Sequence, residues 1–113
     1  MKDDMQFANK LVPNTNNWAH EIYRTECGTE LRYSNVKSIG IKHIKGHENN
    51  FLVVEFYEPV TSGENSVSSV ALRPRGGVPD NKITMNWMQK EFSAISKWID
   101  RCLRAELERR DKQ

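Results

Sequence analysis

The chain has 113 residues, of which 37% are hydrophobic and 28% are charged, and its formal net charge is +2. This length predicts one domain with a modest hydrophobic core. A net charge so close to zero does not by itself predict a nucleic-acid partner. The first ten residues are charged and contain no long apolar run. We therefore expect no signal peptide and no membrane span, and a cytoplasmic location.

The two cysteines, Cys27 and Cys102, have neither CxxC nor metal-binding spacing. We expect reduced thiols, with Cys102 buried as a small hydrophobic residue. Residues 1–17 are expected to form an N-terminal arm or a short helix, because a weak helical period ends at the turn-forming run 13–17. Residues 18–113 should then form a single domain.

Alternation of apolar and polar residues predicts several strands in the first part of this domain. They are expected at 18–26, 31–45, 51–58 and 67–72, with a further short strand near Ile83 and Met85. The segment 51–58 alternates most clearly, with Leu52, Val54 and Phe56 on one face. The polar loop 46–50 should join it to segment 31–45 as a β-hairpin. Gly40 inside that segment indicates a bulge or a close backbone approach.

Residues 86–111 contain no proline or glycine and have helical periodicity. One apolar line consists of Met88, Phe92, Ile95, Ile99 and Cys102. A second line beside it contains Trp87, Ala94 and Trp98, and we expect these three to contact a second subunit or another partner. Asn86 is the expected N-cap, and Gln89 suits a capping box.

This order of elements predicts an α+β fold. We expect an antiparallel sheet of about four or five strands, covered on one face by the long C-terminal amphipathic helix.

Charges are segregated along the two strands of the predicted hairpin. Residues 31–47 contain four basic residues and no acidic one, whereas residues 48–66 contain four acidic residues and no basic one. Two interpretations stay open. Opposite charges could pair across the hairpin and fix its register, or Lys37, Lys42 and Lys45 could meet phosphate groups on an open face of the sheet.

The loop that follows the last predicted strand contains Arg73, Arg75, Gly76 and Gly77. Two glycines let main-chain N–H groups approach an anion closely, and arginine binds phosphate or carboxylate with two parallel hydrogen bonds. The loop lacks the spacing of a P-loop. It is either the leading candidate for an anion-binding site or a simple connection between strand and helix.

Enzymatic motifs are absent from the sequence. His43 and His47 are four residues apart, but the pattern around them indicates a strand end and a loop, so we expect no metal site. The serines have no nucleophile-elbow context, and no cofactor signature occurs. We expect a non-enzymatic protein without a cofactor.

Three aromatic residues, Trp18, Tyr33 and Tyr57, are candidates for an exposed face of the sheet. Aromatic side chains beside basic ones form stacking platforms for single-stranded nucleic acid. They could instead pack beneath the N-terminal arm or against a second subunit.

The order of strands and helix resembles the single-strand-binding fold of the Whirly and transcriptional-coactivator type. The local run from Ile83 to Asn86, leading into a helix that contains Phe92, is similar to that type. The resemblance covers about a dozen residues and implies a fold, and no functional residue is carried over from it.

Together these features favour a small binding module that we expect to be a dimer. Its expected ligand is nucleic acid, and single-stranded nucleic acid is favoured over duplex. The alternative is an inhibitor, immunity or accessory protein that docks to a partner protein. Segregated charge and a wide apolar helix suit protein docking as well.

Overall fold

The computed structural model describes residues 20–111, with side chains through Arg109. The predicted arm at 1–17 and the stacking candidate Trp18 lie outside this range. The described elements are β2 (Ile22–Arg24), β3 (Glu30–Arg32), η2 (Tyr33–Asn35), β4 (Val36–His43), β5 (Asn50–Ser62), β6 (Asn65–Leu72), η3 (Asp80–Lys82) and α1 (Met85–Asp111).

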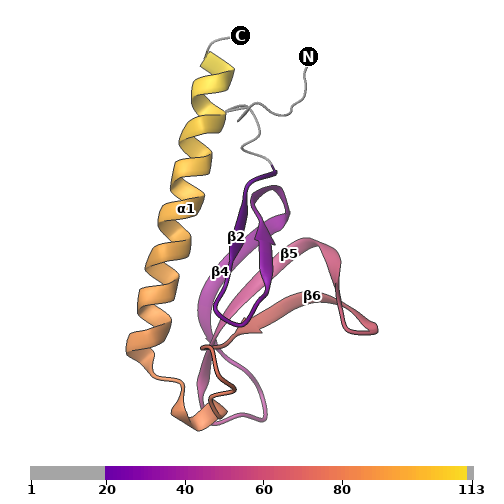
Figure 1. The fold of residues 1–113 in the computed structure, drawn as a ribbon, viewed down its shortest axis with the longest axis vertical. Coiled ribbons are helices and arrows are strands. Elements are labelled where there is room, and N and C mark those ends of the chain that lie inside the picture. Colours follow the sequence, from indigo (N-terminus) through magenta and orange to yellow (C-terminus); the bar gives the residue numbers. More distant parts are fainter. Residues whose placement is uncertain (1–19, 112–113) are drawn as a thin grey trace.

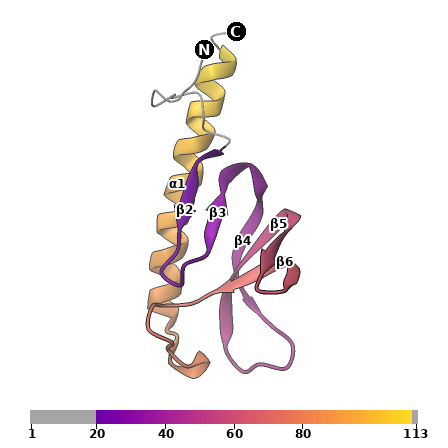
Figure 2. The same ribbon diagram turned by 45° about the vertical axis from the view of Figure 1, so that its right-hand side comes forward.

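The predicted α+β fold is confirmed. The described part of the chain forms five antiparallel strands and one long C-terminal helix that contacts the sheet. The strands divide into a two-stranded sheet, β2–β3, and a three-stranded sheet in the order β4–β5–β6. Figure 1 shows α1 running along one side of the molecule, and Figure 2 shows β2 and β3 beside it.

Several strand boundaries differ from the predicted ones. The segment expected as one bent strand at 31–45 is interrupted by the η2 turn, which separates β3 from β4. The strand expected to end at residue 58 continues through Pro59 to Ser62. No strand forms at residues 83–85, because residues 83 and 84 connect η3 directly to α1, which begins at Met85.

Strand β5 lies in the middle of the larger sheet. Its residues Leu52, Val54 and Phe56 are buried on the face predicted to be apolar. Strand β4 pairs Ile39 with Val54 and Ile41 with Leu52, so that the apolar residues of neighbouring strands coincide. These residues and the buried residues of α1 belong to one hydrophobic cluster.

The N-cap of α1 differs from the expected one. The helix begins at Met85, and the Trp87 amide donates to Thr84 Oγ1 at 3.1 Å. Thr84 is therefore the capping residue, and Asn86 lies within the first turn, so the predicted capping box with Gln89 does not form. Both residues can accept a hydrogen bond at this position, but only Thr84 directly precedes the helical backbone.

Candidate nucleic-acid interface

Phe51 brings together two groups of basic residues that are distant in the sequence. It is the cross-strand partner of Lys42, and the Arg73 guanidinium lies 5.7 Å from the centroid of its ring. The His47 ring meets the Phe51 ring edge-on at 5.3 Å. We call Lys42, His47, Phe51 and Arg73 the Phe51 cluster. The phenyl ring is almost fully buried and belongs to the hydrophobic core.

The Lys42 side chain lies back along its own strand. A Cβ atom at Gly40 would lie 3.7 Å from Lys42 Cε, an ordinary van der Waals distance, so the lysine stem passes beside Gly40. Gly40 pairs with Val53, which is buried although it faces away from Leu52 and Val54. The aliphatic stem of Lys42 therefore helps to cover the sheet, as long basic side chains commonly do.

Lys42 reaches an acidic residue on the neighbouring strand. Its Nζ atom lies 3.3 Å from Glu55 Oε2, and Ser38 Oγ donates to Glu55 Oε1 at 2.6 Å. The hydrogen bond from Ser38, followed by Lys42, lowers the pKa of Glu55, and Lys37 adds a smaller effect. Opposite charges thus meet across the β4–β5 hairpin, as the first interpretation of its charge pattern requires.

The second basic group also has an acidic neighbour. Arg73 forms an ion pair with Asp80 across the loop between β6 and α1. Asn49 donates to the Asp80 carbonyl oxygen at 2.6 Å and connects this loop to the β4–β5 turn. A hollow of about 440 Å³ lies here, lined by residues 46–49 together with Phe51, Asp80 and Asn81. Arg73 is thereby held beside the end of the larger sheet.

The Arg75–Gly77 part of the loop already holds an anion, the carboxylate of Glu26. The Arg75 amide donates to Glu26 Oε1 at 3.2 Å, and Trp87 Nε1 donates to Oε2 at 3.1 Å. These two bonds lower the pKa of Glu26, the one from Trp87 most strongly. Gly76 and Gly77 both have left-handed backbone conformations, which glycine adopts without strain. The predicted anion loop thus contacts the turn between β2 and β3.

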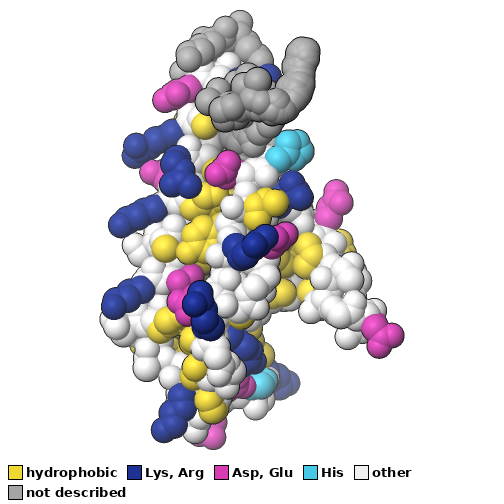
Figure 3. All heavy atoms as spheres, in the orientation of Figure 1, with side chains coloured by type: hydrophobic (Ala, Val, Ile, Leu, Met, Phe, Trp, Pro, Cys, Tyr) yellow, Lys and Arg dark blue, Asp and Glu magenta, His cyan; other side chains and the backbone are white. Residues whose placement is uncertain are grey.

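The remaining predicted basic residues lie on either side of the Phe51 cluster. Lys37 is exposed and is the extra residue in a β-bulge, because Val36 pairs with Phe56 and Ser38 with Glu55. Lys45 is exposed in the turn that follows β4. Basic and acidic side chains are interspersed over the face shown in Figure 3, apart from a row of basic ones along the outer edge of α1.

The aromatic candidates have different environments. Tyr57 is 65% exposed. Tyr33 is half-buried, its ring is edge-on to Trp98 at 6.3 Å, and its hydroxyl donates to Glu106 at 3.2 Å. Tyr33 is thus engaged beneath α1, and Tyr57 is the stacking candidate with an accessible ring in the described range.

The expected interface residues on α1 do not form one exposed surface. Trp98 is only 3% exposed and lies between Tyr23 and Tyr33, so it belongs to the core. Trp87 and Ala94 are half-buried. Periodicity identified Trp98 as apolar but could not show that the β2–β3 sheet covers this side of the helix.

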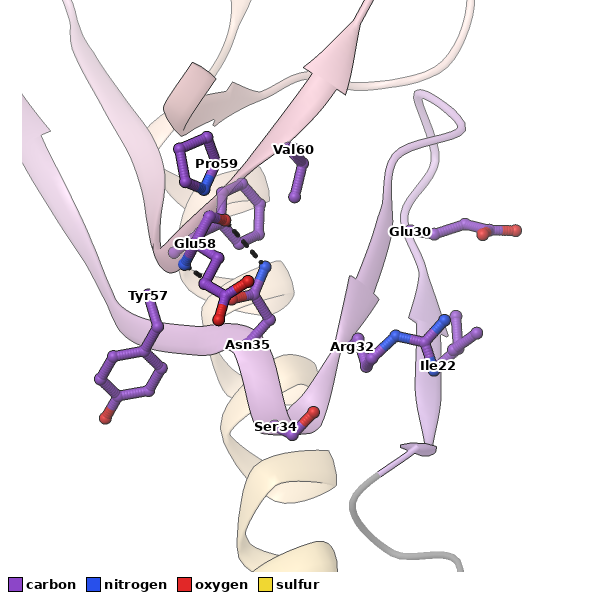
Figure 4. A pocket seen from close by; sticks show the side chains of 10 residues that line it. Ile22, Glu30, Arg32, Ser34, Asn35, Tyr57, Glu58, Pro59 and Val60 are labelled. Atoms are coloured by element: carbon purple, nitrogen blue, oxygen red, sulfur yellow. Dashed lines mark hydrogen bonds between the residues drawn. The ribbon is translucent and has the colours of Figure 1, made fainter. Parts of the chain in front are cut away.

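A hollow that the sequence pattern does not predict lies between the two sheets. It measures about 470 Å³ and is lined by β2, β3 and the middle of β5. Figure 4 shows Asn35 and Glu58 in its centre, with Tyr57 pointing to the side opposite Arg32 and Ile22. Pro59 is the residue in the sequence that could have indicated an irregularity of the sheet here, because proline inside a strand indicates a bulge or an edge.

His43 and Cys27 are engaged within the protein. His43 Nε2 lies 2.8 Å from the His47 carbonyl oxygen. Burial raises the pKa of the Cys27 thiol, but the hydroxyls of Thr25 and Thr29 and the Arg73 main chain outweigh burial and lower it overall. Within residues 20–109, no three potential ligands gather as a metal site. No helix in the described range is long and apolar enough to cross a membrane.

The basic residues at the end of β4 and β5 and in the loop after β6 thus lie beside acidic partners, Glu55 and Asp80. A comparison of the chain with protein-family models, curated proteins and solved structures finds no match.

Proposed function

We propose that this protein binds single-stranded nucleic acid through the Phe51 cluster. The observation that carries the proposal is that Phe51 pairs with Lys42 across the β4–β5 ladder and has the Arg73 guanidinium beside its ring. Two basic side chains from separate segments can there contact phosphates of one strand. Lys45 lies in the adjoining turn and extends the basic surface.

The ion pairs within the cluster are compatible with phosphate binding. The side chains of Lys42 and Arg73 are 45% and 44% exposed, and those of their acidic partners are similarly exposed. Exposed ion pairs contribute only about 0–1 kcal/mol to stability. A phosphate can therefore replace either carboxylate at small energetic cost, and release of counterions from the nucleic acid favours the exchange.

Tyr57 supports a single-stranded ligand. Alternation along β5 places Tyr57 on the face of Phe51 and Glu55, six residues beyond Phe51 and hence about 20 Å away. Its exposed ring offers a stacking surface to an unpaired base, which is worth about 1–3 kcal/mol per base. A duplex keeps its bases stacked inside and cannot use this ring.

Fluorescence anisotropy with labelled single-stranded and duplex oligonucleotides tests the proposal. We expect salt-dependent binding with a preference for the single strand. Lys42→Ala and Arg73→Ala should each weaken binding and lower the salt slope by about 1. Tyr57→Ala should weaken binding of the single strand more than that of the duplex. Lys97→Ala, which removes an exposed lysine on α1, is the matched control and should bind normally.

Absence of binding at low salt would contradict the proposal, as would equal effects of Lys97→Ala and Lys42→Ala. The hollow between the sheets favours the second candidate, docking to a partner protein, because exposed Tyr57 and Ile22 line it together with Pro59. A stoichiometric complex that resists nuclease and is lost in Tyr57→Ala alone would identify that function.

A further inference from the structure

Strand β6 has an unusual free edge. It is the last strand of the sheet β4–β5–β6, and within the described residues its main chain pairs only with β5. All eight of its residues, from Asn65 to Leu72, are uncharged, and none is proline. Edge strands usually carry charged residues, proline or bulges that prevent pairing with another chain. β6 itself carries no charge and no proline, and the irregularity in its pairing with β5 lies between Ser69 and Val67, where the additional residues belong to β5.

The opposite edge of the same sheet differs. Strand β4 contains a bulge at Lys37 and a second exposed lysine, Lys42. Both features are typical of an edge that does not pair with other strands. Among residues 20–111, the sheet therefore has one protected edge and one edge that is available for pairing.

The main-chain groups of β6 have a definite orientation. The two-residue turn Gly63–Glu64 joins Ser62 to Asn65, and the pair beside such a turn is hydrogen-bonded. The N–H and C=O groups of Asn65 therefore point toward β5. Those of Ser66, and by alternation those of Ser68, point toward the free edge. Both serine side chains are exposed, and the hairpin projects from the body of the molecule (Figure 1).

We propose that the free edge of β6 pairs with β6 of a second copy of this chain, antiparallel and around a two-fold axis at Ser68. In an antiparallel pair, two opposed residues exchange hydrogen bonds when the N–H and C=O groups of each point toward the other strand. Ser68 opposite Ser68 of the second copy satisfies this requirement. The two three-stranded sheets then join into one continuous sheet.

The charges at the two ends of β6 favour a second copy in this orientation. Glu64 precedes β6 and Arg73 follows it. With Ser68 opposite its symmetry mate, Glu64 lies level with Leu72 of the second copy and beside the adjacent Arg73. The two-fold axis repeats this pairing at the other end, whereas a parallel arrangement would place like charges together. The proposal does not depend on nucleic-acid binding.

Sedimentation velocity at increasing protein concentration tests the pairing. We expect wild-type protein to pass from monomer to dimer and to form no larger species, because the β4 edge is protected. Ser68→Lys places two lysines opposite each other and should weaken dimerisation about fivefold or more. Thr61→Lys is the matched control, because it adds the same charge to the same hairpin on β5 and should dimerise normally. A monomer at every concentration would overturn the proposal.

A disulfide trap measures the register directly. In a Cys27→Ser background, which removes the exposed native thiol, Ser68→Cys should form a disulfide-linked dimer under mild oxidation. Directly opposed residues of antiparallel strands have Cα atoms about 4.5–5.5 Å apart, within the range of a disulfide. Thr61→Cys should stay monomeric under the same conditions. Equal cross-linking of both variants, or a wild-type dimer that Ser68→Lys does not weaken, would exclude β6 as the interface. Circular dichroism of each variant confirms folding.

Discussion

At the residue scale, the Asn35 side chain makes the hydrogen bonds of a neighbouring strand at the place where β5 bends. Strand β4 pairs with β5 as far as Phe56, and β6 pairs with it again only from Val60. In between, Asn35 Nδ2 donates to the Glu58 carbonyl oxygen at 3.1 Å, and the Glu58 amide donates to Asn35 Oδ1 at 2.9 Å. The side-chain amide thus satisfies both main-chain groups of Glu58, as a neighbouring strand would.

We predict that Asn35→Ala destabilises this bend locally. Two hydrogen bonds at a partly exposed site contribute about 1–2 kcal/mol together. Hydrogen exchange should show faster exchange of the Glu58 amide and of the β5–β6 hairpin, with little change in α1. Ser34→Ala, at the neighbouring exposed position, is the control and should exchange as wild type. Unchanged protection at Glu58 in Asn35→Ala would show that water substitutes for the side chain.

At the element scale, polar contacts at the edge of the core attach the β2–β3 sheet to α1. Tyr23 Oη donates to Glu91 Oε1 at 3.4 Å, and Trp87 donates to Glu26. Burial is the main cause of the raised pKa of Glu91, and the nearby Glu26 carboxylate adds to it. Burial, followed by Glu91, likewise raises the pKa of Tyr23. Ionised Glu91 therefore opposes the packing that this contact supports.

We predict that Glu91→Gln stabilises the protein at neutral pH. A raised pKa in the folded state means that stability falls as pH rises from the ordinary glutamate value of about 4.3 through the folded value. Glutamine still accepts from Tyr23 but has no charge to bury. Urea unfolding across this pH range should show a gain over wild type at neutral pH that disappears below pH of about 4. The exposed Glu108→Gln is the control, and an equal gain in both variants would refute the role of burial.

The Glu26 and Glu55 carboxylates have the opposite effect on how stability depends on pH. The pKa of each is lowered in the folded protein. They stabilise the fold above the ordinary glutamate pKa, and this contribution is lost as pH falls through the lowered values. The difference between Glu91→Gln and wild type removes the shared contribution of Glu55 and leaves the effect of Glu91 together with its repulsion from Glu26.

The elements that were predictable from sequence are those with a long, uninterrupted period. The helix extends over 27 residues without proline or glycine, and its predicted start is wrong by one residue. The strands are short, and their boundaries depend on tertiary contacts. The η2 turn after β3 carries neither glycine nor proline, and its local turn signal is limited to Ser34 and Asn35.

The candidate site was predictable only in part for a related reason. Composition identified the basic strand and the Arg/Gly loop as separate features. Their meeting at Phe51 depends on the β4–β5 register and on the path of the loop after β6. Glu26 is the clearest omission, because its contacts with Arg75 and Trp87 span about 50 and 60 residues.

At the scale of the whole molecule, both sheets and the helix share one core. Leu31 of β3, Leu52 and Val54 of β5 and Ile95 of α1 are fully buried in the same cluster. Trp98 lies beside both Tyr23 and Tyr33, at 5.5 and 6.3 Å between ring centroids. This side chain links the smaller sheet to the helix, and removing it affects more than one element.

We predict that Trp98→Ala lowers the free energy of unfolding by about 3–5 kcal/mol, because it leaves a large cavity in the core. Leu107→Ala on the same helix should change it by no more than about 0.5 kcal/mol, since Leu107 is 47% exposed. The loss of unfolding free energy in Trp98→Phe should lie between those of Trp98→Ala and Leu107→Ala. This variant keeps a ring between the tyrosines and removes the Trp98 indole N–H, which is buried without a hydrogen-bond partner in the described part of the chain.

Hydrogen exchange of Trp98→Ala distinguishes one cooperative core from two. If the sheets share their stability through this residue, protection should fall in β2–β3, in β5 and in α1 by the same free energy. Loss confined to β2–β3 would mean that the larger sheet and the helix fold without the smaller one. The shared hydrophobic cluster favours the first outcome, because Leu31 of the smaller sheet and the central residues of β5 are buried together.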